Sequence, residues 1–411
     1  MIPTYTPVVE EKQRADPILV VFVFALTFCN RYILCVCLLI IALFLVALKQ
    51  YKFYKTRLPG CFFVFLIMLQ CSITGVYGLG SHVFSFWPFF RDLMLVLLIP
   101  CFWFASQFFL CRFKVRKYDF EYSFVVSCTL ICIFKSIESI SSLKTGLMPT
   151  DRVDEWLISI SLFLIICHYA YIFYKRRWQG IFSVLIIFVQ FIISFSRISI
   201  IIVLILLFGQ MLRRPRVLIK VSMAVSIFIS LGSFFFKEQF TLLQEKFLRS
   251  ITEVSSRDTW NADQVVWDWR GFEVFCAKAK YADGDLLNKI FGWGFGSEID
   301  AFGYAGLVTH EDSLPFLHNG YYTMLIKGGA LGLLLCFCFY AALIKKIISQ
   351  ESCLYNGITE FAMVIAMLIA TSVIRGLFFE PNFYWLFFFS YLLKRSDCRI
   401  SQKANIAKGE K

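Results

Sequence analysis

Apolar runs of about 20 residues recur along almost the whole of this 411-residue chain. Each run is about long enough to cross the ~30 Å hydrocarbon layer of a membrane as a helix. A spanning segment must satisfy its backbone hydrogen bonds internally, and barrel strands would alternate apolar and polar residues, which these runs do not. A mean hydropathy of +0.70 excludes a soluble domain of this length. We therefore predict an all-α integral membrane protein.

The apolar runs predict about twelve transmembrane helices, of which the first, seventh, eighth and last are short. The predicted spans are residues 17–30, 32–48, 61–79, 93–110, 122–142, 155–174, 180–195, 198–211, 217–236, 321–344, 359–378 and 382–393. No internal repeat relates the two halves of the chain, which counts against transporter folds built from repeated halves.

Clusters of Lys and Arg follow alternate spans and account for the net charge of +13. The positive-inside rule places such clusters in the cytoplasm, and strict alternation of the spans then places both termini there as well. Because topology explains the positive charge, we do not expect nucleic-acid binding. The clusters occupy residues 49–57, 112–117, 175–177, 213–216, 345–346 and 394–399.

A polar segment of 83 residues, 237–319, separates the ninth and tenth predicted spans, and it carries eight Lys or Arg against thirteen Asp or Glu. The alternation places this segment outside, as one large loop inserted into a single polytopic domain, 1–411. We expect an amphipathic surface helix at 238–252 and a second helix at 262–279. On the second helix, one face would carry Val265, Val266, Trp269, Phe272 and Phe275 or Cys276.

Three glycines and a single cysteine further constrain the polar segment. The alternating Gly292, Gly294 and Gly296 predict a tight turn with unusual backbone angles. Of the fifteen cysteines in the chain, only Cys276 lies in this segment, which excludes a disulfide framework within it.

Arg197 interrupts an apolar stretch that runs from Ile181 to Met211. A guanidinium at the centre of one long helix would cost at least ~2.5–3.5 kcal/mol, so two shorter helices with Ser196-Arg197 at their outer turn are expected. Arg197 is then either a topological residue that reaches the headgroups or a ligand for phosphate, which a guanidinium binds in a bidentate manner. Arg270 also has two interpretations. It is either part of a surface ion pair with Glu273 or a phosphate ligand.

His318 opens the tenth predicted span and is followed by Asn319 and two tyrosines. An interfacial histidine is commonly a polar cap, but three of the four histidines of the chain map to the outer face. Lys327 lies nine residues further on, roughly 13 Å deeper along a helix. It either lines a polar cavity or snorkels to the surface. Lys135 and Glu138 are spaced to neutralise each other, and Arg375 is a further candidate for the outer face.

In their order and spacing, these features resemble the O-antigen ligase and polymerase superfamily from about residue 180 to 345. The matching features are Ser196-Arg197, Arg270, Gly292-x-Gly294-x-Gly296, His318-Asn319 and Gly329-x-x-Gly332. The resemblance implies an integral glycosyltransferase of the GT-C type in the bacterial inner membrane, active at the periplasmic face. It implies an undecaprenyl-pyrophosphate-linked oligosaccharide as donor, no metal or other cofactor, membrane lipid as surroundings and a chain-length regulator as partner.

The resemblance also implies roles for the candidate residues. Arg197 and Arg270 would bind the pyrophosphate and stabilise its developing charge. His318 would orient the acceptor hydroxyl or accept its proton. Candidates for contacting or positioning the acceptor are Asn319, Glu273, Tyr322 and Lys327.

Two rival functions remain open at this point. A ligase that transfers finished polymer to lipid A-core would use the same residues, but Gly320-Tyr321-Tyr322 lacks the acidic residue that ligases often place there. A polymerase of lipid-linked repeat units is therefore the leading interpretation. A flippase or another transporter would spread its polar residues along a central pathway, whereas here they gather at one face.

Overall fold

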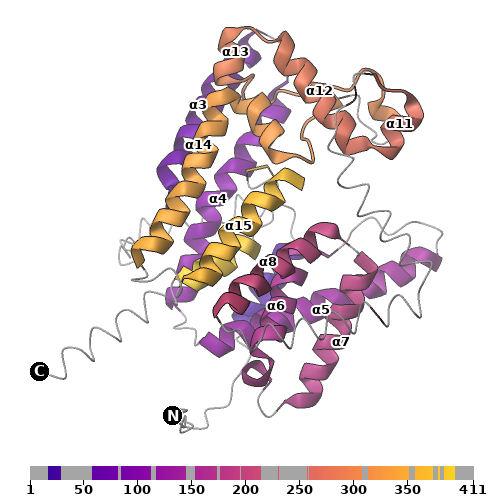
Figure 1. Cartoon of the computed structure of the whole chain (residues 1–411), viewed down its shortest axis with the longest axis vertical. Coiled ribbons are helices and arrows are strands. Elements are labelled where there is room, and N and C mark those ends of the chain that lie inside the picture. The colour runs from indigo at the N-terminus through magenta and orange to yellow at the C-terminus, as the bar shows by residue number, and fades with distance from the viewer. Residues whose placement is uncertain are drawn as a thin grey trace, which may run out of the picture. The chain divides into compact units, whose positions relative to one another are not determined.

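The computed structural model describes the chain in separate stretches (Figure 1). They are residues 17–28, 58–81, 85–112, 117–144, 153–173, 176–194, 196–213, 230, 257, 259–307, 313–350, 357–373, 378–379 and 384–393. Outside them lie the expected surface helix at 238–252, His82, His310, Arg375, the predicted span 32–48 and, apart from residue 230, the predicted span 217–236. The chain groups into two compact units, one of residues 1–30 and 108–199, the other of residues 31–107 and 200–411.

The first unit is a group of helices packed around α5. The long α5 contacts each of the other three helices, and α6 also contacts α7. Asp154 starts α6 by accepting hydrogen bonds from the backbone N–H groups of Trp156 and Leu157 through its carboxylate. The helices of this unit are α1 (Pro17–Phe28), α5 (Lys117–Lys144), α6 (Glu155–Ile172) and α7 (Arg177–Ser194).

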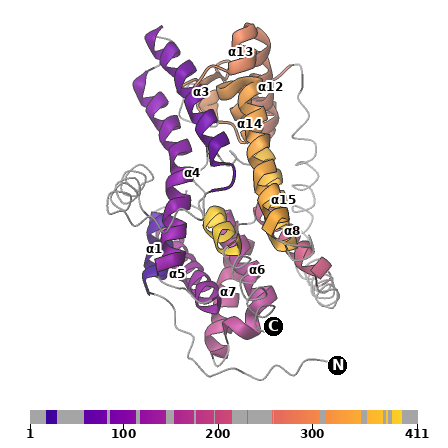
Figure 2. The ribbon, with the colours of Figure 1, turned by 90° about the vertical axis from the view of Figure 1, so that its left-hand side faces the viewer.

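The second unit is built on the pair α3 and α14, which lie side by side in Figures 1 and 2. The backbone of α14 leaves the helical conformation at Gly329, which has φ 64°. α15 packs on α14, and α4 runs beside α3 in Figure 2. The helices of this unit are α3 (Cys61–Gly80), α4 (Phe86–Arg112), α8 (Arg197–Arg213), α14 (Gly320–Gln350) and α15 (Ile358–Val373); α4 and α8 begin or end in the first unit.

The described part of the polar segment is folded and belongs to the second unit. It forms short helices and one antiparallel pairing in which Ile299 lies opposite Leu314. The expected helix at 262–279 is present but is divided at Asp268, whose backbone is not helical. The elements are α11 (Ala262–Trp267), α12 (Trp269–Asp283), α13 (Leu286–Phe291), β1 (Ile299–Asp300), η2 (Ala305–Leu307) and β2 (Ser313–Leu314).

Each predicted span that falls in the described part coincides with a helix, and four helices are long and apolar enough to cross a membrane. These four are residues 61–80, 86–107, 119–138 and 320–349. The expected break at Ser196-Arg197 is confirmed, because α7 ends at Ser194 and α8 begins at Arg197. The protein is therefore a mostly helical, membrane-embedded protein, while the total of twelve spans stays a prediction.

Candidate functional site

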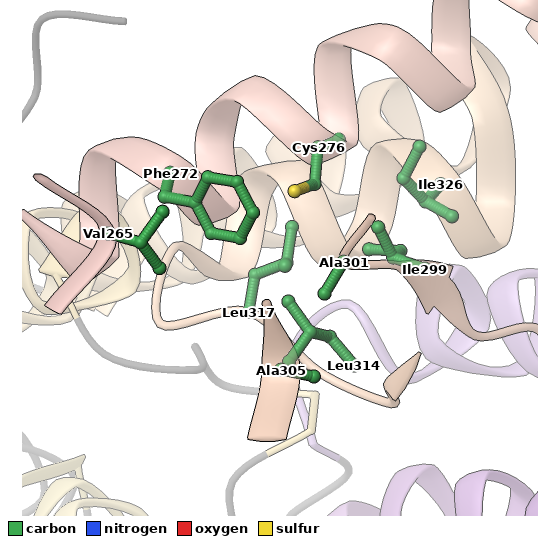
Figure 3. Packing of buried hydrophobic residues seen from close by; sticks show 10 residues of the cluster. Val265, Phe272, Cys276, Ile299, Ala301, Ala305, Leu314, Leu317 and Ile326 are labelled. Atoms are coloured by element: carbon green, nitrogen blue, oxygen red, sulfur yellow. The ribbon is translucent and has the colours of Figure 1, made fainter. Parts of the chain in front are cut away.

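A small apolar core beneath α12 fixes the chain that leads to His318 (Figure 3). Phe272 and Cys276 face Leu317 from α12, and Leu314 of β2 lies on the other side of Leu317. All four side chains are buried, so the backbone on either side of Leu317 has little freedom. Val265 belongs to this core, whereas Val266 is 53% exposed, so the prediction that Val266 shares a face with Val265 is wrong.

The carboxylate of Glu273 on α12 holds His318 through two contacts. Oε2 accepts a hydrogen bond of 2.7 Å from the backbone N–H of His318, and Oε1 lies 2.8 Å from Nδ1 of its ring. The Glu273 side chain is 3% exposed and the His318 side chain 40% exposed. Glu273 is therefore buried, whereas the side chain of His318 is accessible.

The pairing with Glu273 determines how the imidazole of His318 can act. A carboxylate only accepts hydrogen bonds, so the neutral ring carries its proton on Nδ1 and leaves Nε2 with a free lone pair. A histidine whose Nδ1 is held by a carboxylate can accept a proton at Nε2 while the carboxylate stabilises the resulting charge. The geometry therefore suits a general base or a hydrogen-bond acceptor for a hydroxyl.

Asn319 and Thr323 complete the turn from His318 into α14. The Asn319 carboxamide oxygen accepts hydrogen bonds from the N–H groups of Tyr321 and Tyr322, which caps the start of the helix. The Thr323 hydroxyl accepts a hydrogen bond of 3.0 Å from the N–H of Leu317. Tyr322 packs partly buried against the apolar core. Asn319 thus has a structural task, and its expected contact with an acceptor stays a prediction.

Arg270 lies three residues before Glu273, about one turn along α12. Its side chain is partly exposed, and within the part of the chain that the structure describes it forms no ion pair. The expected ion pair with Glu273 is not formed, and both oxygens of that carboxylate contact His318 instead. The guanidinium is thus close along the helix to the residue that holds His318, and it is not neutralised by that residue.

Lys327 forms a fully buried ion pair with Asp92 of α4, with 2.5 Å between Nζ and Oδ2. The two side chains are 1% and 0% exposed. The ammonium also donates to the carbonyl of Ser297, at 2.8 Å. Lys327 therefore neither snorkels to the surface nor lines an open cavity, and both of these predictions are wrong. Instead, it joins α14 to α4 and to the segment after the glycine turn.

Asp92 supports the site, and the sequence analysis did not identify it. Besides Lys327, it accepts a hydrogen bond of 2.8 Å from the N–H of Gly296 and one of 3.2 Å from Nε of Arg91. The guanidinium of Arg91 and the ammonium of Lys327 each lie against the ring of Phe316, at 4.8 and 5.0 Å from its centroid. Phe316 is two residues from His318. The charged cluster of Asp92, Arg91 and Lys327 therefore stabilises the chain that leads to the site. An aspartate at the edge of an apolar run was the available signal.

Two titratable side chains of α12 have shifted pKa values. Burial lowers the pKa of Lys280 to about 8, and the nearby charge of Lys327 adds to the effect, while Glu298 and Asp300 oppose it. Burial, together with the negative charges of Glu273 and Asp300, raises the pKa of the Cys276 thiol to about 12. The thiol is therefore protonated at neutral pH and is not a nucleophile.

Arg197 starts α8 in the first unit, beside the beginning of α6. The hydroxyl of Ser196 donates a hydrogen bond of 2.9 Å to the carboxylate of Glu155. The role of Arg197 with Arg270 and His318 stays a prediction, because these residues belong to the other unit. Lys135 and Glu138 form the expected pair, with 2.9 Å between Nζ and Oε2.

Comparison with known proteins returns no matching family model and no significantly similar curated protein. Among the described residues, no group of three or more His, Cys, Asp or Glu side chains is arranged to hold a metal ion.

Proposed function

We propose that this protein is a polymerase of polyprenyl-pyrophosphate-linked oligosaccharide repeat units and that His318 is its general base. The two contacts from the buried Glu273 to His318 are the observation that carries the proposal. A carboxylate held this way fixes the ring and leaves Nε2 for the acceptor. The resemblance in motif order supplies the substrate class.

In the proposed reaction, a hydroxyl oxygen of the acceptor saccharide forms a bond to the anomeric carbon of the donor. The bond between that carbon and the pyrophosphate oxygen breaks, and the hydroxyl proton passes to Nε2 of His318. The polyprenyl pyrophosphate leaves with the bonding electron pair. Arg270, which no carboxylate of the described residues neutralises, would stabilise the charge on the leaving group, and Arg197 would contribute as the sequence predicts.

The proposal places the reaction at the periplasmic face of the bacterial inner membrane. Supporting this placement, the described polar segment carries both His318 and Arg270, and the positive-inside rule assigns that segment to the outside. General base catalysis typically contributes ~10²–10⁴-fold, so loss of His318 should reduce the rate by about that factor.

The test is the gel profile of surface polysaccharide from a deletion strain that carries wild type, Arg270→Ala or His318→Ala. Lipid A-core capped by a single repeat unit in the null strain and in both variants is expected for a polymerase. Bare core with lipid-linked polymer in the inner membrane would identify a ligase instead. Lys278→Ala, an exposed position of the same helix, is the control for charge and expression and should give the wild-type profile.

A normal profile in both point variants would remove His318 and Arg270 from the chemistry. Imidazole added to vesicles that contain His318→Gly gives a sharper assay. Recovery of transfer would show that the missing group is the imidazole itself, because the position is 40% exposed and accessible to a small base.

A further inference from the structure

The turn after α13 lies beside the middle of α3, a candidate membrane-spanning helix, and against the break in α14. The side-chain amide of Gln70 donates a hydrogen bond of 3.0 Å to the carbonyl of Phe291. The N–H of Phe295 donates one of 2.9 Å to the carbonyl of Cys71. Figure 1 shows α13 next to α3 and α14, and both helices contact it.

The depth of this contact follows from helix geometry. Cys71 precedes the end of α3 at Gly80 by nine residues, which is about 13 Å along the axis. α3 has 20 residues, so its length of about 30 Å only just matches the hydrocarbon layer. α3 therefore places residues 291–295 within the hydrocarbon layer.

Irregular backbone is tolerated at membrane depth only where its polar groups are satisfied by the protein. The carbonyls of Ile326 and Lys327 accept hydrogen bonds from the N–H groups of Trp293 and Gly294, each at 2.9 Å. Gln70 also donates to the carbonyl of Gly328, at 2.5 Å. These three carbonyls precede the break of α14 at Gly329, so the turn and the interrupted helix satisfy each other. A loop in water would not need this pairing.

Two close approaches between backbones make the pairing possible. A Cβ added at Gly294, which has φ 82°, would lie 2.1 Å from the backbone nitrogen of Gly75. A Cβ added at Gly329 would lie 2.4 Å from the carbonyl oxygen of Ile290. The glycines therefore allow the turn to insert between α3 and α14.

α13 itself exposes a concentrated set of large apolar side chains. Leu286 is 73% exposed and Leu287 64%, while Ile290 and Phe291 are each 39% exposed. On α3, the exposed side chains on either side of Gln70 include Leu69 and Ile73, which a spanning helix directs to lipid. The apolar surface of α13 thus continues a surface that already faces acyl chains.

We propose that residues 286–297 form a re-entrant segment and that the exposed side chains of α13 contact acyl chains of the adjacent leaflet. β1 follows this segment directly and pairs with β2, which leads to His318. The re-entrant segment therefore anchors the site at a fixed height relative to the membrane. The membrane depth of this segment is independent of the chemistry assigned to His318.

The test measures depth with a fluorescent amino acid incorporated at position 287 of the full-length protein in lipid nanodiscs. The quenchers are lipids with a nitroxide on the upper acyl chain and, separately, a water-soluble nickel chelate. Position 73 on α3 is the lipid-facing control and position 278 on α12 the aqueous control, both exposed. We expect the ratio of lipid quenching to aqueous quenching at 287 to match that at 73 and to exceed that at 278.

Quenching at 287 mainly by the chelate would overturn the proposal, since α13 would then lie in water. Protection from both quenchers would overturn it as well, because a protein would then cover the helix. If label at 287 prevents folding, position 286 serves the same purpose, since it is the more exposed of the two. The readout needs no enzymatic activity, so it stands or falls separately from the proposed function.

Discussion

Two of the buried carboxylates in the described part of the chain, Glu273 and Asp92, hold partners that differ in exposure. Glu273 holds His318, whose side chain is 40% exposed, whereas Asp92 holds Lys327, which is 1% exposed. An accessible partner can exchange a proton with a substrate, and an inaccessible one can only stabilise the fold. At the scale of single residues, this difference in exposure assigns Glu273 and His318 to the candidate site and Asp92 and Lys327 to the structure that holds it.

Glu273→Gln should lower the transfer rate of the protein with a smaller effect on its stability. The amide retains size and one oxygen but no longer stabilises a protonated imidazole, so part of the ~10²–10⁴-fold effect of a general base is lost. The measurement is kcat and KM with a polyprenyl-linked donor in proteoliposomes, beside the Tm in detergent. A fall in kcat at unchanged Tm is expected. A wild-type kcat would show that Glu273 only orders the backbone at His318.

Asp92→Asn should destabilise the second unit strongly, because it leaves the ammonium of Lys327 buried without its counter-charge. Breaking a buried ion pair from one side typically costs about 3–5 kcal/mol. The double variant Asp92→Leu with Lys327→Met removes both charges and should recover much of the loss. Thermal unfolding in detergent measures both effects; a double variant less stable than Asp92→Asn would contradict this account.

Lys280 should make stability rise with pH between about 8 and its ordinary pKa near 10.5. Its pKa in the fold is lowered to about 8, so in that window the unfolded chain binds more protons than the folded protein. Below pH 8 the burial cost of the charge is fully present, and it is relieved as the pH increases. The Tm of wild type minus that of Lys280→Met should therefore increase from pH 7.5 to 9.5, and a constant difference would contradict the shift.

At the scale of elements, the glycine turn offers a matched pair of substitutions. Gly294 and Gly303 have similar backbone angles, φ 82° and 78°, so alanine at either position costs the same ~1–2 kcal/mol of strain. A Cβ at Gly303 meets nothing within 4 Å, whereas one at Gly294 would collide with α3. Gly294→Ala should therefore prevent stable folding while Gly303→Ala is tolerated. Equal yields of folded protein from the two variants would contradict the close packing of the turn on α3.

The sequence predicted elements better than it predicted contacts between them. The lengths of the apolar runs predicted the helices. The charged Arg197 within an apolar run predicted the break between α7 and α8. The glycine spacing predicted the turn, and all three glycines have positive φ. The partner of Lys327 was not predictable, since 235 residues separate it from Asp92 and no local pattern joins them. The same reason explains why Glu273 was assigned to Arg270, its neighbour on the helix, rather than to His318.

At the scale of the whole molecule, α14 provides a test of the predicted topology. The part of α14 after the break at Gly329, residues 330–350, has 21 residues, about 31 Å, which matches the hydrocarbon thickness, and it ends just after Lys345 and Lys346. The positive-inside rule then places the two lysines inside and the opposite end of this part, near Gly329, outside. Alkaline phosphatase inserted after Arg257 should be active, and green fluorescent protein inserted within residues 351–356 should fluoresce. Active phosphatase after Arg257 together with green fluorescent protein that does not fluoresce at 351–356 would mean that α14 does not cross, and an inactive phosphatase after Arg257 would contradict the outer location of the proposed site.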